Sequence, residues 1–443
     1  MSNKEFNEAL EKTEKALKEG NEQEAFSAIR PIFAYPGMVA TEDSLVKALE
    51  VFTPLAKSIG GEDLQNLVAL VASKPDDENL LFDLSYALYD QGLFPFSATL
   101  LSRANAVAPS SPKILAELAT TFEMMMLYHQ ARTVLEASPD ALKNSAFLRY
   151  LHGFHTLMSG DVESAREILD EVLQTDEDDV LSAAGQLEGM VIRAEELKKK
   201  GHLGEQDLRG WHLALNGSLL LQLSPFGFDD GMNGRYAFLN DSYGLCHEGC
   251  MRLKQFLDEA KFDVERVYYI AERSSEILAR AMAKILDKPL VEWGDGKEKP
   301  GLIVVYDLAF TPTHELFESL QMQRPGQLLW AHASCWTNPF PYSPDITTFL
   351  YQSNTAPWTG GGMIYNTKTQ EMSESEADES PAEELAEKIL AGEFETPEDG
   401  EAPARLLQEL KKVPKNAYPG VLRSSGFRAR QRAGSPVPSA RFV

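Results

Sequence analysis

The sequence has only three cysteines in 443 residues, and it has no long run of apolar residues. So few cysteines, in an odd number, do not build a disulfide framework, so the composition favours a reducing compartment, which we expect to be the cytoplasm. No apolar stretch approaches the length that spans a bilayer, and the charged N-terminal stretch has no apolar signal-peptide core. We therefore expect no membrane partner.

Positive charge is scarce over most of the chain, whose formal net charge is −25. Residues 371–401 contain thirteen acidic residues against one lysine, whereas residues 402–443 contain nine basic residues against one glutamate. Residues 1–370 carry a net charge of −21. A body this acidic repels a polyanion, so the composition predicts no general binding of nucleic acid. The basic end leaves a local exception open.

A repeat of 34 residues runs through residues 78–180. Small residues recur where one helix must pass close to the next, in two series: Ser85, Ala119 and Gly153, and Ser97, Ala131 and Ala165. Leucines follow the second series four residues later, one helical turn along the same face. A helix pair of this length cannot bury its apolar face alone, so the pattern predicts pairs that stack into a superhelix.

These residues resemble the tetratricopeptide repeat, most clearly in "LLFDLSYALYDQGLFPFSATLLSRANAVAP", and the stretch around Gly20 indicates an atypical earlier repeat. The resemblance covers about the first 200 residues. It implies a groove that binds a segment of a partner protein, and this is the interpretation we favour. The alternative is a helical solenoid that only supports the rest of the chain. We place this domain at residues 1–195, followed by a linker at residues 196–209.

Residues 210–366 have the pattern of an α/β domain. Short apolar runs at 267–270, 289–293, 302–308 and 326–336 predict strands, and helical patterns separate most of them. This alternation predicts a mostly parallel sheet with both faces covered. Ser274 or Ser275 is expected to cap the helix that follows the first of these strands. Ligands of such sheets bind beyond the carboxyl ends of the strands.

The order of strand, Ser-rich turn, helix, "DKPLV" and "LIVVYDLAFTPT" resembles the type I phosphoribosyltransferase fold. In that family the last strand ends in two acidic residues and leads into a loop that holds the ribose 5-phosphate. Here Tyr306 and Asp307 occupy the acidic positions, and the loop "LAFTPT" lacks the family's glycine. The mobile loop of the family is replaced by the short turn "GDGKEKPG", so the resemblance implies a domain that has lost catalysis.

The chain therefore has two candidate functions. The favoured one is a protein-interaction adaptor or assembly factor, without catalytic residues, metal or cofactor. The alternative is an enzyme or nucleotide sensor that binds a phosphoribosyl compound with Mg²⁺. Its candidate ligand-binding residues are Arg273, Ser274, Ser275, Asp307, Thr311 and Thr313. For Asp307 we favour a turn-forming or helix-capping role instead.

Two further patterns have open interpretations. "CHEGC" and "HASC" contain Cys246, Cys250, His332 and Cys335, which are zinc-ligand types, although buried core cysteines are the interpretation we favour. The aromatic, Pro-rich and Gly-rich stretch 334–366 is expected to cover the sheet edge or to line a ligand cleft. The remaining residues, 367–443, are predicted to form a disordered acidic and then basic tail, with one short helix after Pro381.

Overall fold

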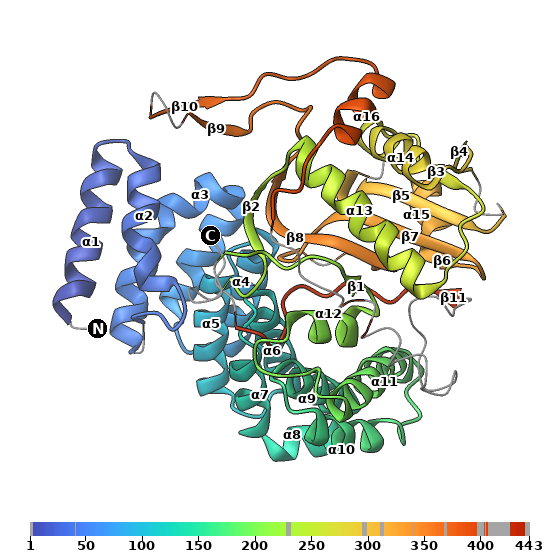
Figure 1. Cartoon of the computed structure of the whole chain (residues 1–443). Helices are drawn as coiled ribbons and strands as arrows, with labels where there is room; N and C mark the ends of the chain where they lie inside the picture. Colours follow the sequence, from blue (N-terminus) through green and yellow to red (C-terminus); the bar gives the residue numbers. More distant parts are fainter. Residues whose placement is uncertain are drawn as a thin grey trace. The chain divides into compact units, whose positions relative to one another are not determined.

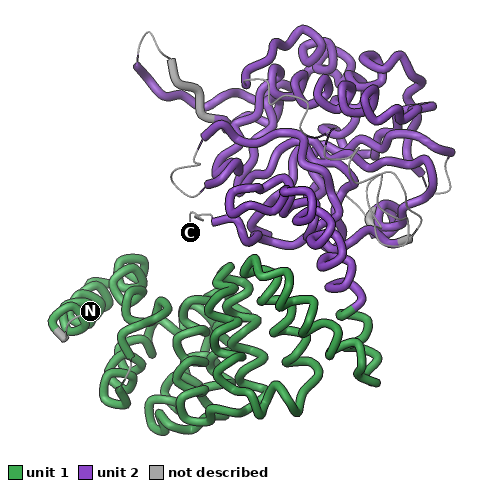
Figure 2. The backbone as a smooth tube through the Cα atoms, turned by 60° about the horizontal axis from the view of Figure 1, so that its bottom comes forward, with its two compact units in different colours: residues 1–184 green, residues 185–443 purple. Residues whose placement is uncertain are grey.

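The computed structural model describes residues 3–39, 41–226, 232–294, 299–310, 314–338, 340–366, 370–396, 403, 405 and 426–438. The chain divides into two compact units, residues 1–184 and residues 185–443, which Figure 2 shows in separate colours. We name them the repeat unit and the sheet unit. The division falls inside helix α11 (Asp178–Lys199) and so precedes the predicted boundary at residue 195.

The repeat unit consists of helices that pair through tight turns and stack one pair after another (Figure 2). Its helices are α1 (Asn3–Lys18), α2 (Glu22–Phe33), α3 (Glu42–Ser73), α4 (Glu78–Asp90), α5 (Phe94–Val107), α6 (Pro112–Met124), α7 (Tyr128–Glu136), α8 (Pro139–Asn144), α9 (Ala146–Met158) and α10 (Val162–Val172). Helix α3 is interrupted by non-helical backbone at Gly60 and Gly61. The predicted helical repeat superhelix is confirmed.

The 34-residue period corresponds to one helix pair. The first series of small residues lies on α4, α6 and α9, the second lies on α5, α7 and α10, and all six residues are buried. The turn of each pair contains a residue with left-handed backbone at the same spacing. These residues are Gly92 (φ 73°), Met126 (φ 58°) and Gly160 (φ 88°). Small buried residues let paired helices approach closely, which is the role that the sequence predicted for them.

The sheet unit contains the following elements: α12 (Leu208–Asn216), β1 (Leu219–Leu220), β2 (Tyr236–Asn240), α13 (Tyr243–Ala260), β3 (Val267–Tyr269), α14 (Arg273–Leu286), β4 (Leu290–Glu292), β5 (Gly301–Asp307), the 3-10 helix η1 (Leu308–Phe310), α15 (His314–Gln321), β6 (Met322–Gln323), β7 (Gln327–Cys335), β8 (Ile346–Thr355), β9 (Met363–Asn366), β10 (Glu371–Glu374), α16 (Ala382–Leu390) and β11 (Gly426–Phe427). None of the described helices of the chain is both long and apolar enough to cross a lipid bilayer.

The main sheet is parallel at every pairing, in the order β4, β3, β5, β7, β8, with β1 and β2 both paired to β8 (Figure 1). The four predicted strands correspond to β3, β4, β5 and β7, and the predicted parallel sheet is confirmed. Strand β8 was not predicted, because its residues stand between prolines in the aromatic stretch that we interpreted as a cover for the sheet.

Helices cover both faces of this sheet. Helix α14 packs on β3 and β5, and α13 and α16 pack beside it (Figure 1). Successive side chains of a strand point to opposite faces. Ile303, Val305 and Leu329 therefore share a core with Leu316 and Leu320 of α15 on one face. On the other face, His332 of β7 lies directly beneath Gly249 of α13.

Two segments of the predicted disordered tail are structured. The predicted helix after Pro381 is confirmed as α16, which buries Leu385, Ala386 and Ile389. Residues 426–438 pack into the sheet unit, where Arg428 forms a buried ion pair with Asp345. The prediction of disorder is therefore wrong for residues 370–396 and 426–438, because charge composition does not reveal these long-range contacts. The rest of the predicted tail, apart from 403 and 405, lies outside the described residues.

Candidate functional site

The carboxyl ends of β3 and β5 bring together four of the residues that the sequence singled out. Arg273, Ser274 and Ser275 begin α14, and Asp307 ends β5. The cap of α14 is Glu272, whose carboxylate accepts hydrogen bonds from the backbone N–H groups of Ser274 (2.7 Å) and Ser275 (2.8 Å). The predicted serine cap is therefore wrong. A carboxylate already occupies the helix N-terminus where an anionic ligand would bind.

The two serine hydroxyls hold the fold together at this edge. Ser275 Oγ accepts a hydrogen bond from the Tyr306 backbone N–H at 3.0 Å, which ties α14 to the end of β5. Ser274 Oγ accepts a hydrogen bond from the Trp358 indole N–H, also at 3.0 Å. Both contacts are buried. They account for the two serines as packing groups, and their predicted role as ligands remains untested.

Asp307 is buried, with 1% of its surface exposed. Its carboxylate accepts hydrogen bonds from the Tyr351 hydroxyl and from the Ala309 backbone N–H, the second at 2.9 Å. The bond to Ala309 is the turn-forming role that we favoured from sequence. Burial raises the pKa of Asp307 to about 6. A carboxylate so enclosed is poorly placed to bind the hydroxyls of a ribose.

Tyr306 and Asp307 do not act as a pair. They are adjacent in β5, so their side chains point to opposite faces of the sheet. The Tyr306 hydroxyl donates a hydrogen bond to Asp241 at 2.8 Å on the α13 face, away from Tyr351. Thr311 and Thr313, the other candidate phosphate ligands, lie outside the described residues.

The Arg273 side chain is held by backbone carbonyls of the same chain. Its guanidinium donates hydrogen bonds to the backbone carbonyls of Asp378 (2.7 Å) and Ser380 (3.2 Å), in the segment that precedes α16. The Tyr243 hydroxyl and Lys388 bind the Asp378 carboxylate, and the contact with Lys388 lowers the pKa of this half-buried carboxyl. The acidic segment before α16 therefore lies at the edge of the sheet where a ligand would be expected.

The cysteine and histidine residues named from the sequence are only partly brought together. Cys246 and His332 lie close to Asp241, a residue that sequence reasoning did not select. Cys250 is buried one turn further along α13. Cys335 is half-buried, and its sulfur lies 3.3 Å from the Thr337 hydroxyl. All three cysteines are free thiols.

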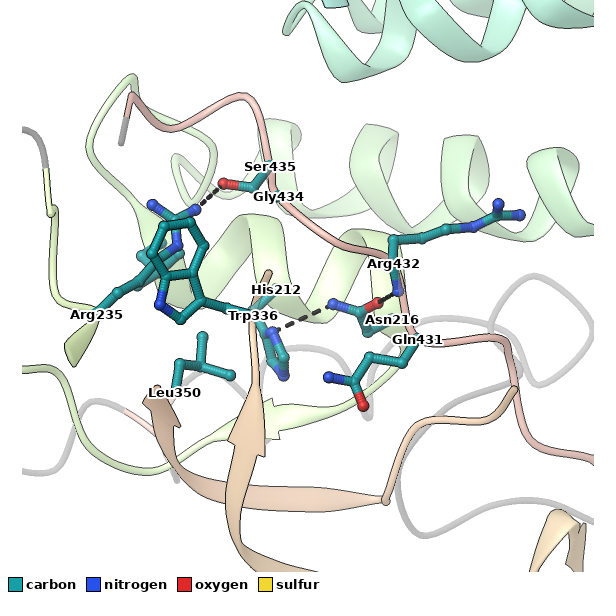
Figure 3. A pocket seen from close by; sticks show the side chains of 10 residues that line it. His212, Asn216, Arg235, Trp336, Leu350, Gln431, Arg432, Gly434 and Ser435 are labelled. Carbon is teal, nitrogen blue, oxygen red and sulfur yellow. Dashed lines mark hydrogen bonds between the residues drawn. The ribbon is translucent and has the colours of Figure 1, made fainter. Parts of the chain in front are cut away.

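A small cavity lies where the C-terminal segment crosses the sheet unit (Figure 3). Its volume is about 10 Å³, which is room for about one water molecule. The His212 imidazole lines it and lies 3.2 Å from the Asn216 amide, and burial lowers the pKa of His212 to about 3. Arg235 stacks over Trp336 with 5.0 Å between the guanidinium carbon and the ring centre. A cavity of this size is a gap between packed segments and is too small for a ligand larger than water.

Aromatic and acidic side chains gather on the first helices of two successive pairs of the repeat unit. This surface is formed by Tyr86, Tyr89 and Asp90 of α4 and by Glu117 and Glu123 of α6, and we name it the acidic aromatic surface. Tyr86 is 48% exposed. Burial and the nearby Asp90 carboxylate raise the pKa of Glu117. Asp90 therefore disfavours the charged form of Glu117, which the nearby Lys113 ammonium partly offsets, and a further cation bound here would reduce the remaining repulsion.

Comparison with solved structures gives neighbours that cover the N-terminal part of the chain. No protein-family model matches the sequence, and no curated protein matches it. Similar solved structures include a tetratricopeptide-repeat protein of Thermus thermophilus, with 18% identity over 41% of this chain and 98% of that one and a TM-score of 0.25. MamA of Desulfovibrio magneticus has 12% identity over 39% and 96%, with a TM-score of 0.24. PilF of Pseudomonas aeruginosa has 16% identity over 44% and 86%, with a TM-score of 0.26. The repeat architecture described above is established by the chain's own helix pairs and by their 34-residue period.

Proposed function

We propose that this protein is an interaction adaptor, acting in the cytoplasm, whose repeat unit binds a basic, extended segment of a partner protein. The observation that carries the proposal is the acidic aromatic surface on the first helices of consecutive repeats. Stacked repeats make extended surfaces of the kind that bind protein segments. Exposed tyrosines provide contact area with little loss of conformational freedom, and they are enriched at interfaces.

Electrostatics supports a basic partner. Residues 1–184 contain thirty acidic and fourteen basic residues, so the repeat unit has a net charge of −16. Around Tyr89 the carboxylates of Asp90, Glu117 and Glu123 all raise the pKa of the phenol, after burial itself. A lysine or arginine side chain placed among them gains attraction to three carboxylates and reduces their mutual repulsion. Nucleic acid would be repelled by the same field, so we propose no such partner.

For the sheet unit we propose a scaffold domain that resembles a phosphoribosyltransferase and lacks its catalysis. The intramolecular contacts of Ser274, Ser275 and Asp307 support this proposal, since each group is already engaged in packing. The alternative, a Mg²⁺-dependent phosphoribosyl site, is favoured by one observation. Asp307 ends a central strand of a parallel sheet, which is where such folds bind their ligands.

The adaptor proposal is tested by selecting peptides from a random displayed library on the full-length protein. We expect the selected peptides to be rich in lysine or arginine. Tyr86→Ala and Glu117→Lys should each weaken their binding by about tenfold or more. Glu167→Lys makes the same charge change at an exposed residue of α10, outside this surface, and is the matched control. Neutral peptides, or an equal effect of the control, would reject the proposal.

The alternative is tested by calorimetric titration of the full-length protein with phosphoribosyl diphosphate and Mg²⁺. The full chain is needed because residues 426–438 are part of the sheet unit. The scaffold proposal predicts no binding at millimolar ligand. Micromolar binding that is lost in Asp307→Asn would make this a ligand-handling domain. That result would leave the adaptor role of the repeat unit open to its own test.

A further inference from the structure

Three side chains that commonly bind metals meet inside the sheet unit. Asp241 directly follows β2, Cys246 lies in the first turn of α13, and His332 lies within β7. One oxygen of Asp241 lies 3.0 Å from His332 Nε2 and 3.3 Å from Cys246 Sγ. The three ligand atoms all lie within 4.8 Å of one another. Ligand atoms around a tetrahedral zinc ion, with metal–ligand bonds of about 2.0–2.3 Å, are separated by roughly 3–4 Å.

The fold fixes these groups in place. Their exposed fractions are 5% for Asp241 and 0% for Cys246 and His332. Helix α13 passes directly over the imidazole at Gly249, where a Cβ atom would lie only 2.6 Å from His332 Nδ1. Only glycine permits this approach of helix to ring. The site is therefore rigid and closed to solvent, as structural metal sites are.

The charges of this cluster are unbalanced without a cation. Asp241 is a buried carboxylate that contacts the imidazole of His332, and in the part of the chain that is described no lysine or arginine lies within 4.0 Å of it. The carboxylate accepts hydrogen bonds from the Ser242 backbone N–H and the Tyr306 hydroxyl, which stabilise it without neutralising its charge, and a buried charge without a counter-ion is costly. A divalent ion bound by one carboxylate, one thiolate and one neutral imidazole forms a group of zero net charge. A metal thus removes the electrostatic cost that the three side chains otherwise carry.

We propose that Asp241, Cys246 and His332 form a structural zinc site. Thiolate and imidazole together favour Zn²⁺ over harder ions such as Mg²⁺, which prefers oxygen ligands. On binding, the thiol proton of Cys246 leaves to solvent, and the imidazole proton moves from Nε2 to Nδ1. The Tyr306 hydroxyl donates a hydrogen bond to the same oxygen of Asp241 at 2.8 Å.

This assignment differs from the ligand set that the sequence pattern offered. Cys250 and Cys335 are left out of it, and Asp241 replaces them. The sequence hid the cluster because its members are spread over about ninety residues on three elements, with His332 lying 91 residues after Asp241. The prediction that the chain has no metal is untested by the structure, and the geometry of these residues points the other way.

The test is metal analysis of the full-length protein, followed by chelation and reconstitution with Co²⁺. We expect one zinc per chain as purified, and a tetrahedral Co²⁺ spectrum with a thiolate-to-cobalt charge-transfer band. Cys246→Ser should abolish that band. Asp241→Asn and His332→Gln should lower Zn²⁺ affinity by more than the roughly 10–100-fold typical of residues behind the ligands. Cys250→Ser and Cys335→Ser are matched thiol controls and should retain the metal.

Metal analysis of the natural chain tests the zinc site even where a variant fails to fold. Absence of zinc from protein purified with zinc in the medium, together with no Co²⁺ band after reconstitution, would overturn the site. Retention of the charge-transfer band in Cys246→Ser, or its loss in Cys250→Ser, would overturn this choice of ligands. Asp241→Asn has nearly the same shape as the natural residue, so its metal affinity reports charge more than packing.

Discussion

The repeat unit and the sheet unit are stabilised by contacts of very different range along the chain. In the repeat unit each helix packs mostly on the helices next to it in sequence. In the sheet unit, Asp345 is paired with Arg428, 83 residues later, and the Asn233 amide donates a hydrogen bond to the carbonyl of Pro438, 205 residues later. Local contacts of the first kind follow from local sequence patterns. Contacts of the second kind depend on residues 426–438, and no local sequence pattern connects these residues to the sheet.

The same division allows the two units to be measured separately in the intact protein. All five tryptophans belong to the sheet unit: Trp211, Trp293, Trp330, Trp336 and Trp358. Tryptophan fluorescence therefore reports unfolding of the sheet unit, while far-UV circular dichroism also contains the helical signal of the repeat unit. Hydrogen exchange read from peptides of each unit assigns any change to its place in the chain.

The largest effect is expected from breaking the buried ion pair that joins residues 426–438 to the sheet unit. Arg428 Nη2 lies 2.7 Å from Asp345 Oδ2, and their side chains are 3% and 6% exposed. Arg428→Met leaves the Asp345 carboxylate buried without its cation, which should destabilise the sheet unit by about 3–5 kcal/mol. Urea unfolding followed by tryptophan fluorescence measures this loss.

Arg430→Met is the control for Arg428→Met, because Arg430 is exposed only two residues away. It should change stability by no more than about 0.5 kcal/mol. Exchange in peptides of the repeat unit should be unaffected by either variant. An equal loss in both variants would show that residues 426–438 contribute through their backbone rather than through this ion pair.

A second effect should appear in the repeat unit as the pH falls. His155 is fully buried in α9, neither ring nitrogen has a hydrogen-bond partner among the described residues, and burial lowers its pKa to about 3. The unfolded chain has the ordinary value near 6.5, so it binds the proton first. The stability contributed by neutral His155 is complete above pH 6.5 and is lost as the pH falls toward 3.

His155→Leu removes this titration. Between pH 7 and pH 4 the natural repeat unit should lose about 3 kcal/mol more stability than the variant. The measurement is urea unfolding by circular dichroism at each pH, with fluorescence as the reference for the sheet unit. His129→Leu, at an exposed residue, is the control and should leave the pH profile unchanged. Parallel profiles for natural protein and His155→Leu would contradict the burial argument.

The sheet unit should show the opposite pH dependence at Asp307. Its folded pKa of about 6 is above the ordinary value of 3.8, so its contribution to stability is complete below pH 3.8 and is lost as the pH rises to 6. The free energy of unfolding of Asp307→Asn, measured relative to that of the natural protein, should therefore rise by roughly 2 kcal/mol between pH 4 and pH 7. Fluorescence-detected urea unfolding measures the difference. Asp263→Asn, at an exposed carboxylate, should give a flat difference.

The sequence predicted most of the fold and little of the candidate site, for a physical reason. Helix pairs, the 34-residue period and the apolar strands are local signals, and the structure confirms them. Strand β8 lies in a stretch of prolines and aromatics, and its pairing with β7 comes from tertiary context. Arg428 gains its role from a residue far away in the chain, and the role of Asp241 depends on His332, 91 residues later, as well as on nearby Cys246. Composition described residues 426–438 as a charged tail, but it did not reveal the buried Asp345 that binds Arg428.

The smallest effect tests the repeat pattern at the level of a single backbone angle. Met126 has φ 58°, where the repeats before and after it have Gly92 and Gly160. A residue with a Cβ atom is strained in this region, so Met126→Gly should stabilise the repeat unit by about 0.5–1 kcal/mol.

Gly92→Ala should destabilise the repeat unit by about 1 kcal/mol, although no atom of the described residues lies within 4 Å of the added Cβ. Because that Cβ meets open space, the loss can come only from the backbone. Opposite signs for the two variants, measured by circular dichroism, would show that the turn of each repeat selects its residue by backbone conformation. A loss of stability in Met126→Gly would mean that the packing of the half-buried Met126 side chain outweighs the strain.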